Sequence, residues 1–523
     1  MDIYRELRQA ARALRRSPGV TVWSIVILAL GIGAATAVFS VVNGMLLRPL
    51  PVTAQDRLVR ITKNDVERGF DHYPLYYSEY LEWSRRSREF ESLAAFWAWG
   101  TNDGLLLGSA EPAHFSISRV SGNFFEVLGA SSHVGRTLRS EDDRATGVPP
   151  LVLSHRAWRD RFGSDPAVVG RTLPVRLAER TSFLVVGVMP EAFDLFGPAE
   201  AWTPILAVDP QWAESPACEC DLIGRLAVGA TPERALAELQ TIHENLASER
   251  PDEYRSVRVV LSPLLWSVVG GAGRASLLAF GSVGLLLAIA VANVAGLSLI
   301  RALGRTREVA IRSALGAGTA SLLRERLTES VLISAAALTG GFVLARLGIK
   351  ALLVLKGADL PRVQGIDVDS RALVFSMGLA ALATAICALL PVLFGAPESL
   401  KSRRGGVSQG RLMQWMVVGE IALALPLLFA SGLLVRTLLA NGAIDRGFDT
   451  ENLLALEVLL PPSKYPDPES RLTLIEELVR RIEALPGILS ATTMRVNPSS
   501  RWAGISGPLA FEGQTEEQAR ANP

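Results

Sequence analysis

Five long apolar segments constrain this chain more than any other feature of its sequence. They occupy residues 20–47, 277–300, 330–355, 372–394 and 412–439. Each reaches the length of about 20 residues that an α-helix needs to cross about 30 Å of hydrocarbon. The composition agrees, because 49% of the residues are hydrophobic and only 20% are charged. The sequence therefore predicts an α-helical transmembrane bundle of five spans rather than a soluble enzyme.

Basic residues gather beside three of these segments, and the positive-inside rule makes such flanks cytoplasmic. They precede the first segment, follow the second and follow the fourth: Arg5, Arg8, Arg12, Arg15 and Arg16; Arg301, Arg305, Arg307, Arg312, Arg324 and Arg326; Lys401, Arg403, Arg404 and Arg411. Residues 1–19 also have apolar residues at helical spacing, which predicts a cytoplasmic interfacial helix. The expected topology has the N-terminus and the linker 398–411 inside, with residues 48–274 and everything after 439 outside.

The long segment 48–274 has the composition of a soluble α+β domain. Short β-rich runs at 151–153 and 183–188 alternate with helical patterns at 78–93 and 232–246. The five histidines are scattered and the three cysteines have no metal-ligand spacing, so we expect no catalytic residues, cofactor or metal. A net charge of +1 gives no reason to expect a nucleic-acid partner.

Several short motifs resemble a known family of membrane proteins. SGNFFEVLG, GRTL, VLSHRAW, RFG, VGR and VGVMP look like the MacB-type periplasmic core domain; they lie at 121–129, 135–138, 152–158, 161–163, 169–171 and 186–190. REVAIRSALG at 307–316 and LTESV at 327–331 are similar to the FtsX-like permease domain, which we assign to 275–397. Ser131, Ser132 and His133 depart from the family pattern in one loop. The layout is similar to that of the duplicated orphan permeases.

The resemblance implies a permease subunit of an ABC-type exporter or mechanotransmission complex in the bacterial inner membrane. Such a subunit works with membrane lipid, with a periplasmic partner or exported substrate, and in some cases as a homodimer. The sequence contains no G-x-x-x-x-G-K-[ST] phosphate loop, so the ATPase is expected in a separate cytoplasmic chain. The alternative is a non-transporting regulator of a cell-wall hydrolase, similar to FtsX proteins of cell division.

The connection 301–326 is the predicted coupling helix between the second and third spans. Its charged and apolar residues can form opposite faces, and Glu308 precedes Arg312 by four residues, the favourable order for an ion pair. We expect the ATPase to dock on Arg305, Arg307, Glu308, Val309, Ile311, Arg312 and Leu315. The alternative is an interfacial anchor whose arginines reach lipid phosphates.

Polar and small residues inside the spans are the remaining candidates. Glu420 in the fifth span and Asn293 in the second are expected to make interhelical hydrogen bonds, and a role of Glu420 in coupling is the alternative. The glycine pairs at 31 and 33 and at 340 and 341 predict close helix packing.

The segment 440–523 looks like the beginning of a second extracytoplasmic domain. A strand-like run at 453–458 is followed by an amphipathic helical pattern at 470–485. The order of span, strand and helix repeats that of the first domain, so we expect a duplicated architecture of which this chain holds an incomplete second copy.

Overall fold

The computed structural model describes most of the chain, which divides into two compact units, residues 1–449 and 450–523. The described residues are 3–66, 70–73, 75–97, 102–107, 113–144, 147–178, 180–193, 195, 199–213, 219–249, 257–304, 319–356, 366–394, 406–442, 453–454, 456, 458, 465 and 467–493. Within the first unit we distinguish the α+β domain, residues 48–263, and the bundle, formed by the long helices before and after it.

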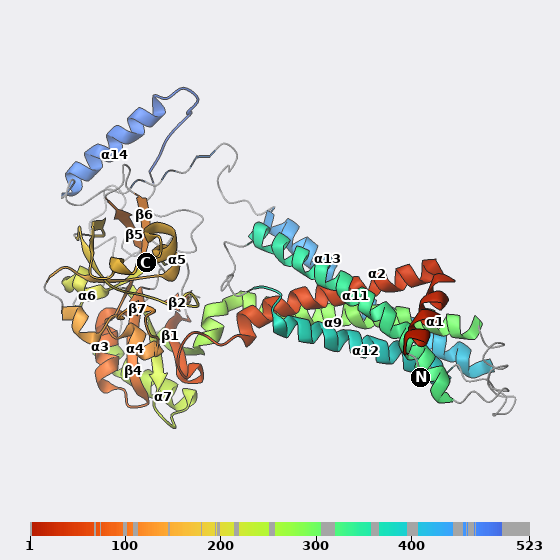
Figure 1. Ribbon diagram of the computed structural model, residues 1–523. Coiled ribbons are helices and arrows are strands. Elements are labelled where there is room, and N and C mark those ends of the chain that lie inside the picture. Colours follow the sequence, from red (N-terminus) through yellow and green to blue (C-terminus); the bar gives the residue numbers. More distant parts are fainter. Residues whose placement is uncertain are drawn as a thin grey trace. The chain divides into compact units, whose positions relative to one another are not determined.

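A single mixed sheet of 14 strands forms the centre of the α+β domain (Figure 1). Its main path runs β14-β1-β13-β4-β6-β12-β8-β11-β7, and most neighbours are antiparallel, whereas β12 pairs with β6 and β11 with β8 in parallel. The strands are β1 Leu58–Asp65, β2 Phe70–Tyr73, β3 Leu75–Tyr76, β4 Phe90–Trp97, β5 Asn102–Leu106, β6 Ala113–Val120, β7 Val134–Gly135, β8 Pro150–Leu153, β9 Thr172–Leu173, β10 Val175–Arg176, β11 Phe183–Val188, β12 Ala201–Pro204, β13 Glu219–Leu226 and β14 Val257–Pro263.

Short helices cover this sheet and close three hydrophobic clusters. Trp83 of one helix is fully buried, and Ser154 caps another by accepting a hydrogen bond from the Ala157 amide at 3.1 Å. The helices are α3 Tyr77–Arg86, α4 Phe124–Leu128, α5 His155–Phe162, α6 Ile205–Val208 and α7 Pro232–Glu249, with 3-10 turns η2 Gln55–Arg57, η3 Ser140–Arg144, η4 Pro166–Val168 and η5 Pro210–Ala213.

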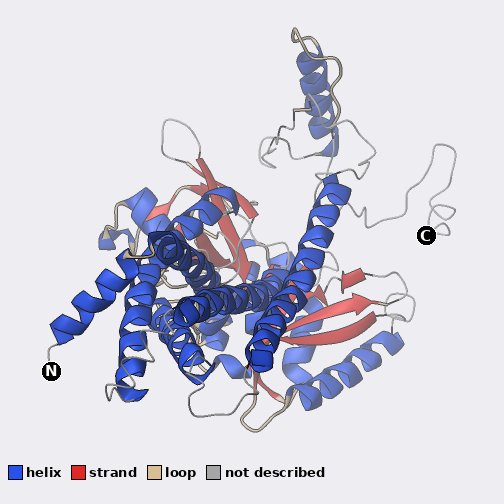
Figure 2. Ribbon diagram, turned by 90° about the vertical axis from the view of Figure 1, so that its right-hand side faces the viewer, coloured by secondary structure: helices blue, strands red, loops and turns tan. Residues whose placement is uncertain are grey.

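Long helices form the bundle. In Figure 2 the described part of the bundle is drawn as helices, and the strands belong to the α+β domain. α2 packs against α9 and α11, and α12 packs against all three of these helices, whereas α13 contacts α9. Five described helices are long and apolar enough to cross a membrane, which confirms the predicted number. The bundle consists of α1 Ile3–Arg15, α2 Pro18–Val42, the π-helical turn η1 Asn43–Leu47, α9 Leu264–Gly304, α11 Thr319–Lys356, α12 Ser370–Phe394 and α13 Gly406–Gly442.

Glycines explain the close packing of α2, as the glycine pairs predicted. A Cβ on Gly33 would lie 2.8 Å from the Gly341 carbonyl oxygen, and one on Gly31 would lie 3.2 Å from the Ala290 Cβ. Because the side chains are absent, the backbones approach closely and gain van der Waals contact.

Two sequence-based boundaries were wrong. The helical pattern at 78–93 ends at Arg86, because β4 then pairs along β13 and, at Phe96, with β6, and its residues 93–96 are buried. The second long helix begins at Leu264 rather than 277. Gly270, which has the non-helical angles φ 52° and ψ −140°, separates the first turn of α9 from its long apolar part. Hydropathy alone detects only the long apolar part.

The second unit contains one described helix, α14, spanning Pro468–Glu483. The Asp467 carboxylate accepts a hydrogen bond from the Ser470 amide at 2.7 Å, and Pro468 occupies the first turn. This helix agrees with the pattern predicted at 470–485. The strand predicted at 453–458 is not formed at the four residues described there.

Candidate functional site

Glycines and a half-buried carboxylate hold the motif-bearing loops of the α+β domain together. A Cβ on Gly122 would lie 2.3 Å from the Arg139 carbonyl oxygen, and one on Gly187 would lie 2.1 Å from that of Arg136. The Gly122 amide donates to Asp143 Oδ2 at 2.9 Å. Burial raises the pKa of the Asp143 carboxyl to about 6. These contacts give the short motifs a structural reason, since only glycine allows the loops to approach so closely.

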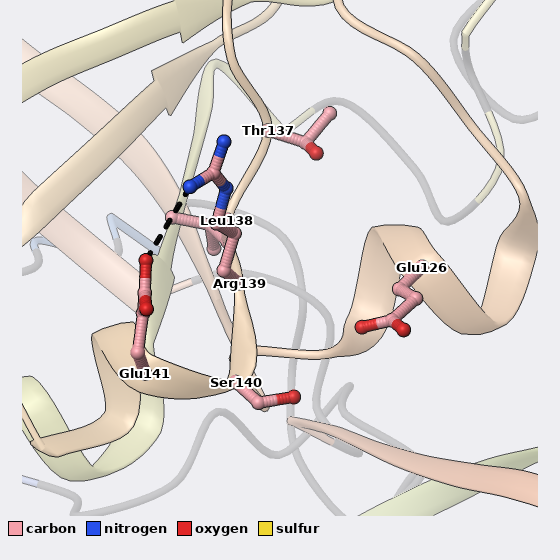
Figure 3. A pocket seen from close by; sticks show the side chains of 6 residues that line it. All are labelled: Glu126, Thr137, Leu138, Arg139, Ser140 and Glu141. Atoms are coloured by element: carbon pink, nitrogen blue, oxygen red, sulfur yellow. Dashed lines mark hydrogen bonds and ion pairs between the residues drawn. The ribbon is translucent and has the colours of Figure 1, made fainter.

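The same loops border an open hollow of about 510 Å³. Its wall combines α4 with the segment that leads into η3, and the lining side chains are polar apart from Leu138 (Figure 3): Glu126, Thr137, Leu138, Arg139, Ser140 and Glu141. Arg139 and Glu141 form an exposed ion pair at 3.4 Å. The lining offers hydrogen-bonding groups but no nucleophile beside a base, so it suits binding better than catalysis.

Two strands of the sheet lead to two helices of the bundle. α2 and η1 are followed by the connection 48–57 and then by β1, whereas β14 ends at Pro263, where α9 begins at Leu264. β1 and β14 are themselves paired, from Val59 opposite Pro263 to Asp65 opposite Val257. The two helices are therefore joined through one hydrogen-bonded ribbon.

The first turn of α9 is part of the core of the α+β domain. Leu264 is fully buried in the cluster that contains Phe124 and Phe125, and Ser267 accepts a hydrogen bond from Arg60 of β1 at 3.0 Å. Arg60 also pairs with the buried Asp221 of β13. Because Gly270 follows, the change of direction falls between this anchored turn and the apolar part of α9.

A ladder of polar and aromatic contacts joins α2 to α12. Thr36 and Ser376 place their hydroxyl oxygens 2.8 Å apart, and the rings of Phe39 and Phe375 stack with centroids 4.2 Å apart. One turn further, at the π-helical turn, Asn43 Nδ2 donates to Asp369 Oδ2 at 3.0 Å. π-Helical turns in otherwise regular helices are frequently found at functional sites.

Comparison with known proteins agrees with this arrangement. The family model of the MacB-like periplasmic core domain matches residues 21–242, and that of the FtsX-like permease C-terminal domain matches residues 280–397. The chain belongs to the MacB- and FtsX-type ABC permeases. It is thus a multi-pass membrane permease with a periplasmic-type domain, which assigns it to the bacterial inner membrane. Such permeases work with an ABC ATPase and are generally not enzymes themselves.

Solved structures of periplasmic and extracellular domains are similar to about two fifths of the chain. The periplasmic region of MacB from Actinobacillus actinomycetemcomitans is 16% identical with a TM-score of 0.31, over 40% of this chain and 90% of that one. A domain of a putative permease from Porphyromonas gingivalis is 16% identical with a TM-score of 0.32, over 40% of this chain and 92% of that one. The extracellular domain of the ABC-type transporter YknZ from Gram-positive bacteria is 10% identical with a TM-score of 0.30, over 39% of this chain and 99% of that one. None of the curated proteins matches this chain.

At the other end of the permease bundle, polar contacts border the predicted coupling segment. Arg301 donates to the Thr21 hydroxyl at 3.0 Å, and that hydroxyl lies 3.0 Å from the Leu14 carbonyl oxygen at the end of α1. Arg326 pairs with the buried Glu329 at 3.1 Å. α1 also buries Ala10 and contacts α11, so it packs on the permease as well as being amphipathic.

The structure describes two of the predicted site residues, Asn293 and Glu420, but none of the coupling residues. All seven coupling residues, from Arg305 to Leu315, lie outside the described part of the chain. Asn293 is half-buried on α9 and Glu420 is partly exposed on α13. Neither forms an interhelical hydrogen bond with a described residue, and the roles expected for them stay predictions.

The ladder between α2 and α12 was not predicted from the sequence. Thr36 and Asn43 are polar residues inside an apolar run, and that signal could have drawn attention to them. Their partners could not have been named, because Ser376 and Asp369 follow more than 300 residues later and nothing local links the two segments.

Proposed function

We propose that this chain is the permease subunit of an ABC-type exporter or mechanotransmission complex. ATP hydrolysed by a separate cytoplasmic chain would move its α+β domain. The observation that carries this proposal is the direct continuation of β14 into α9, together with the pairing of β14 with β1, which follows α2 through the connection 48–57. Because paired strands resist sliding, a displacement of the first turn of α9 would be passed to β14 and, through the pairing, to β1.

The polar ladder and Gly270 supply the parts such a movement needs. Thr36 and Ser376 also lie 2.7 Å from the carbonyl oxygens of Ile32 and Ala372, one turn back in their own helices. Two hydroxyl hydrogens cannot serve all three contacts at once, so the hydroxyls have alternative partners. Gly270 allows the bundle part of α9 to turn while its first turn stays anchored.

The cytoplasmic partner would bind the segment from Arg305 to Leu315. The basic residues around this segment support an inner location. The exposed tryptophans Trp23 and Trp415 are consistent with a membrane interface at this end of α2 and α13, on either side of the membrane. Single cysteines at Ser140 and Ser402 test this topology by labelling intact cells with a membrane-impermeant maleimide. Only Ser140 is expected to react, and reaction of both would refute the topology.

Coupling is tested with the permease and its ATPase reconstituted in nanodiscs. Spin labels at Ser140 and Val354, both exposed, report the position of the α+β domain relative to the bundle. We expect the distance between them to change when ATP replaces ADP. The triple substitution Glu308→Ala, Val309→Ala and Arg312→Ala should abolish this change, whereas Arg436→Ala on α13 should preserve it. An unchanged distance during ATP hydrolysis by the wild-type complex would contradict the proposal.

A further inference from the structure

One exposed face of α11 combines two cations with apolar side chains, and we call it the basic stripe. It consists of Val343, Arg346, Leu347, Lys350 and Val354, which repeat at intervals of three or four residues and therefore share one side of the helix. All five are exposed, with exposed fractions of 53% for Val343 and 57% for Leu347. The bundle therefore leaves this face available to whatever surrounds the helix.

The basic stripe lies on the part of the bundle nearest the α+β domain. Ala345 and Ile349, on the buried side of the same turns, share a cluster with Met45 and with Val269 from the first turn of α9. Gly341 packs at Gly33 near the middle of α2. Arg346 follows Gly341 by five residues, or roughly 7.5 Å of helix, so it lies within the apolar part of the span.

The guanidinium of Arg346 is not directed to the nearer end of the helix. Its Cζ lies 5.4 Å from the ring centroid of Phe342, which is one turn earlier and thus deeper in the span. Helical side chains lean toward the N-terminus of their helix, and here the ring holds the cation in that direction. Neither Arg346 nor Lys350 forms an ion pair with a residue in the described part of the chain. An unpaired cation at this depth is energetically costly, which favours an anionic partner from the surroundings.

We propose that the basic stripe binds the phosphate of an anionic phospholipid from the leaflet on the side of the α+β domain. A guanidinium offers paired donors that match phosphate oxygens, and an ammonium one turn away can reach the same group. Val343, Leu347 and Val354 lie beside the two cations and provide apolar surface for the acyl chains. The site is independent of transport, so it can exist whether or not the coupling proposal is correct.

The experiment compares lipid retention by full-length variants. Wild-type protein, the double variant Arg346→Gln/Lys350→Gln and the control Arg436→Gln are placed in nanodiscs of phosphatidylcholine containing phosphatidylglycerol. They are then extracted into detergent, washed and analysed by native mass spectrometry. Arg436 is a suitable control because it is an exposed cation on another membrane helix, α13, with no second cation one turn away.

We expect the double variant to retain about tenfold less phosphatidylglycerol than the wild type, and Arg436→Gln to retain the wild-type amount. Arg346→Lys keeps the charge and should lose less than the double variant, which separates lipid binding from a folding defect. Equal retention by the double variant and the wild type would overturn the proposal. So would loss of self-association with unchanged lipid retention, because a second copy would then be the partner that covers the basic stripe.

Discussion

The α+β domain and the bundle are stabilised in different ways. In the domain, large side chains such as Trp83, Phe115 and Phe125 are fully buried, and the buried Lys63 and Glu200 form ion pairs. The bundle relies on small residues and a few hydroxyl contacts, and it leaves many large apolar side chains exposed. Between residues 49 and 263 the large apolar side chains exposed in the described part are Val66, Val148 and Val228. The difference teaches that exposed apolar area has to be judged by the solvent: what would be a defect in water is the normal surface of a membrane helix.

The largest expected effect is the loss of a buried charge pair in the α+β domain. Lys63 on β1 is fully buried and lies 2.7 Å from a Glu79 carboxylate oxygen on α3. Lys63→Met leaves this carboxylate buried without its cation, so we expect destabilisation of about 3–5 kcal/mol. Thermal unfolding of the full chain in detergent, followed by near-UV circular dichroism, measures it.

An exposed pair provides the control. Arg159 and Asp160 lie 2.9 Å apart with half of each side chain exposed. Arg159→Met should therefore cost no more than about 1 kcal/mol. Adding Glu79→Leu to Lys63→Met should restore part of the stability, and similar losses in Lys63→Met and Arg159→Met would contradict the role assigned to burial.

Matched glycine substitutions compare the two regions directly. Gly187→Ala directs a Cβ against the Arg136 carbonyl oxygen inside the sheet, and we expect a cost near the upper end of about 1–3 kcal/mol. Gly33→Ala meets the Gly341 carbonyl oxygen, but helices in lipid can move apart, so a cost of about 1 kcal/mol is expected. Both are measured by thermal unfolding.

Gly147 and Gly378 are the control positions, since a Cβ there meets nothing within 4 Å. Alanine at either should change the melting temperature little. A larger fall in melting temperature for Gly33→Ala than for Gly187→Ala would contradict this expectation, because the bundle would then accommodate an added methyl group less well than the sheet.

Asp143 predicts how the stability of the α+β domain depends on pH. Its pKa of about 6 in the folded state exceeds the ordinary value of about 4, so the folded chain holds this proton more tightly than the unfolded chain. The stabilisation that the protonated Asp143 gives to the folded state is complete below about pH 4 and declines as the pH rises toward about 6. Asp143→Asn should remove that decline and stabilise the domain at pH 8 by about 1 kcal/mol, because the carboxylate is partly exposed. Melting temperatures from pH 4 to 8 test it, with the exposed Asp160→Asn as a variant expected to follow the wild type.

The smallest expected effect belongs to the hydroxyl contact between α2 and α12. A double-mutant cycle of Thr36→Val and Ser376→Ala should give a coupling of about 0.6 kcal/mol, typical of interhelical hydrogen bonds in membranes. Thr339→Val is the control, because Thr339 is exposed and its hydroxyl bonds the Ala335 carbonyl oxygen in its own helix. A coupling indistinguishable from zero would mean that the 2.8 Å contact contributes nothing to helix association.

Much of the fold could be predicted because its signals are local. A span needs only a run of apolar residues, and the strand at Phe183–Val188 and the helix at Pro232–Glu249 have their own composition and caps. Predictions failed where a neighbour decides. Phe90–Trp97 is a strand because β13 and β6 flank it, and the start of α9 is hidden because its first turn belongs to the core of the domain rather than to the span.

By itself the sequence determined the number of spans, the insertion of an α+β domain between the first and second, and the glycines that allow close packing. Only the tertiary structure decided that β1 and β14 lie side by side, that Asn43 bonds Asp369, and that Arg346 and Lys350 face outward from the bundle. The physical reason is that hydropathy and propensity act within a few turns of chain. Strand pairing, interhelical hydrogen bonds and the outward face of a helix depend on which distant segment packs against it.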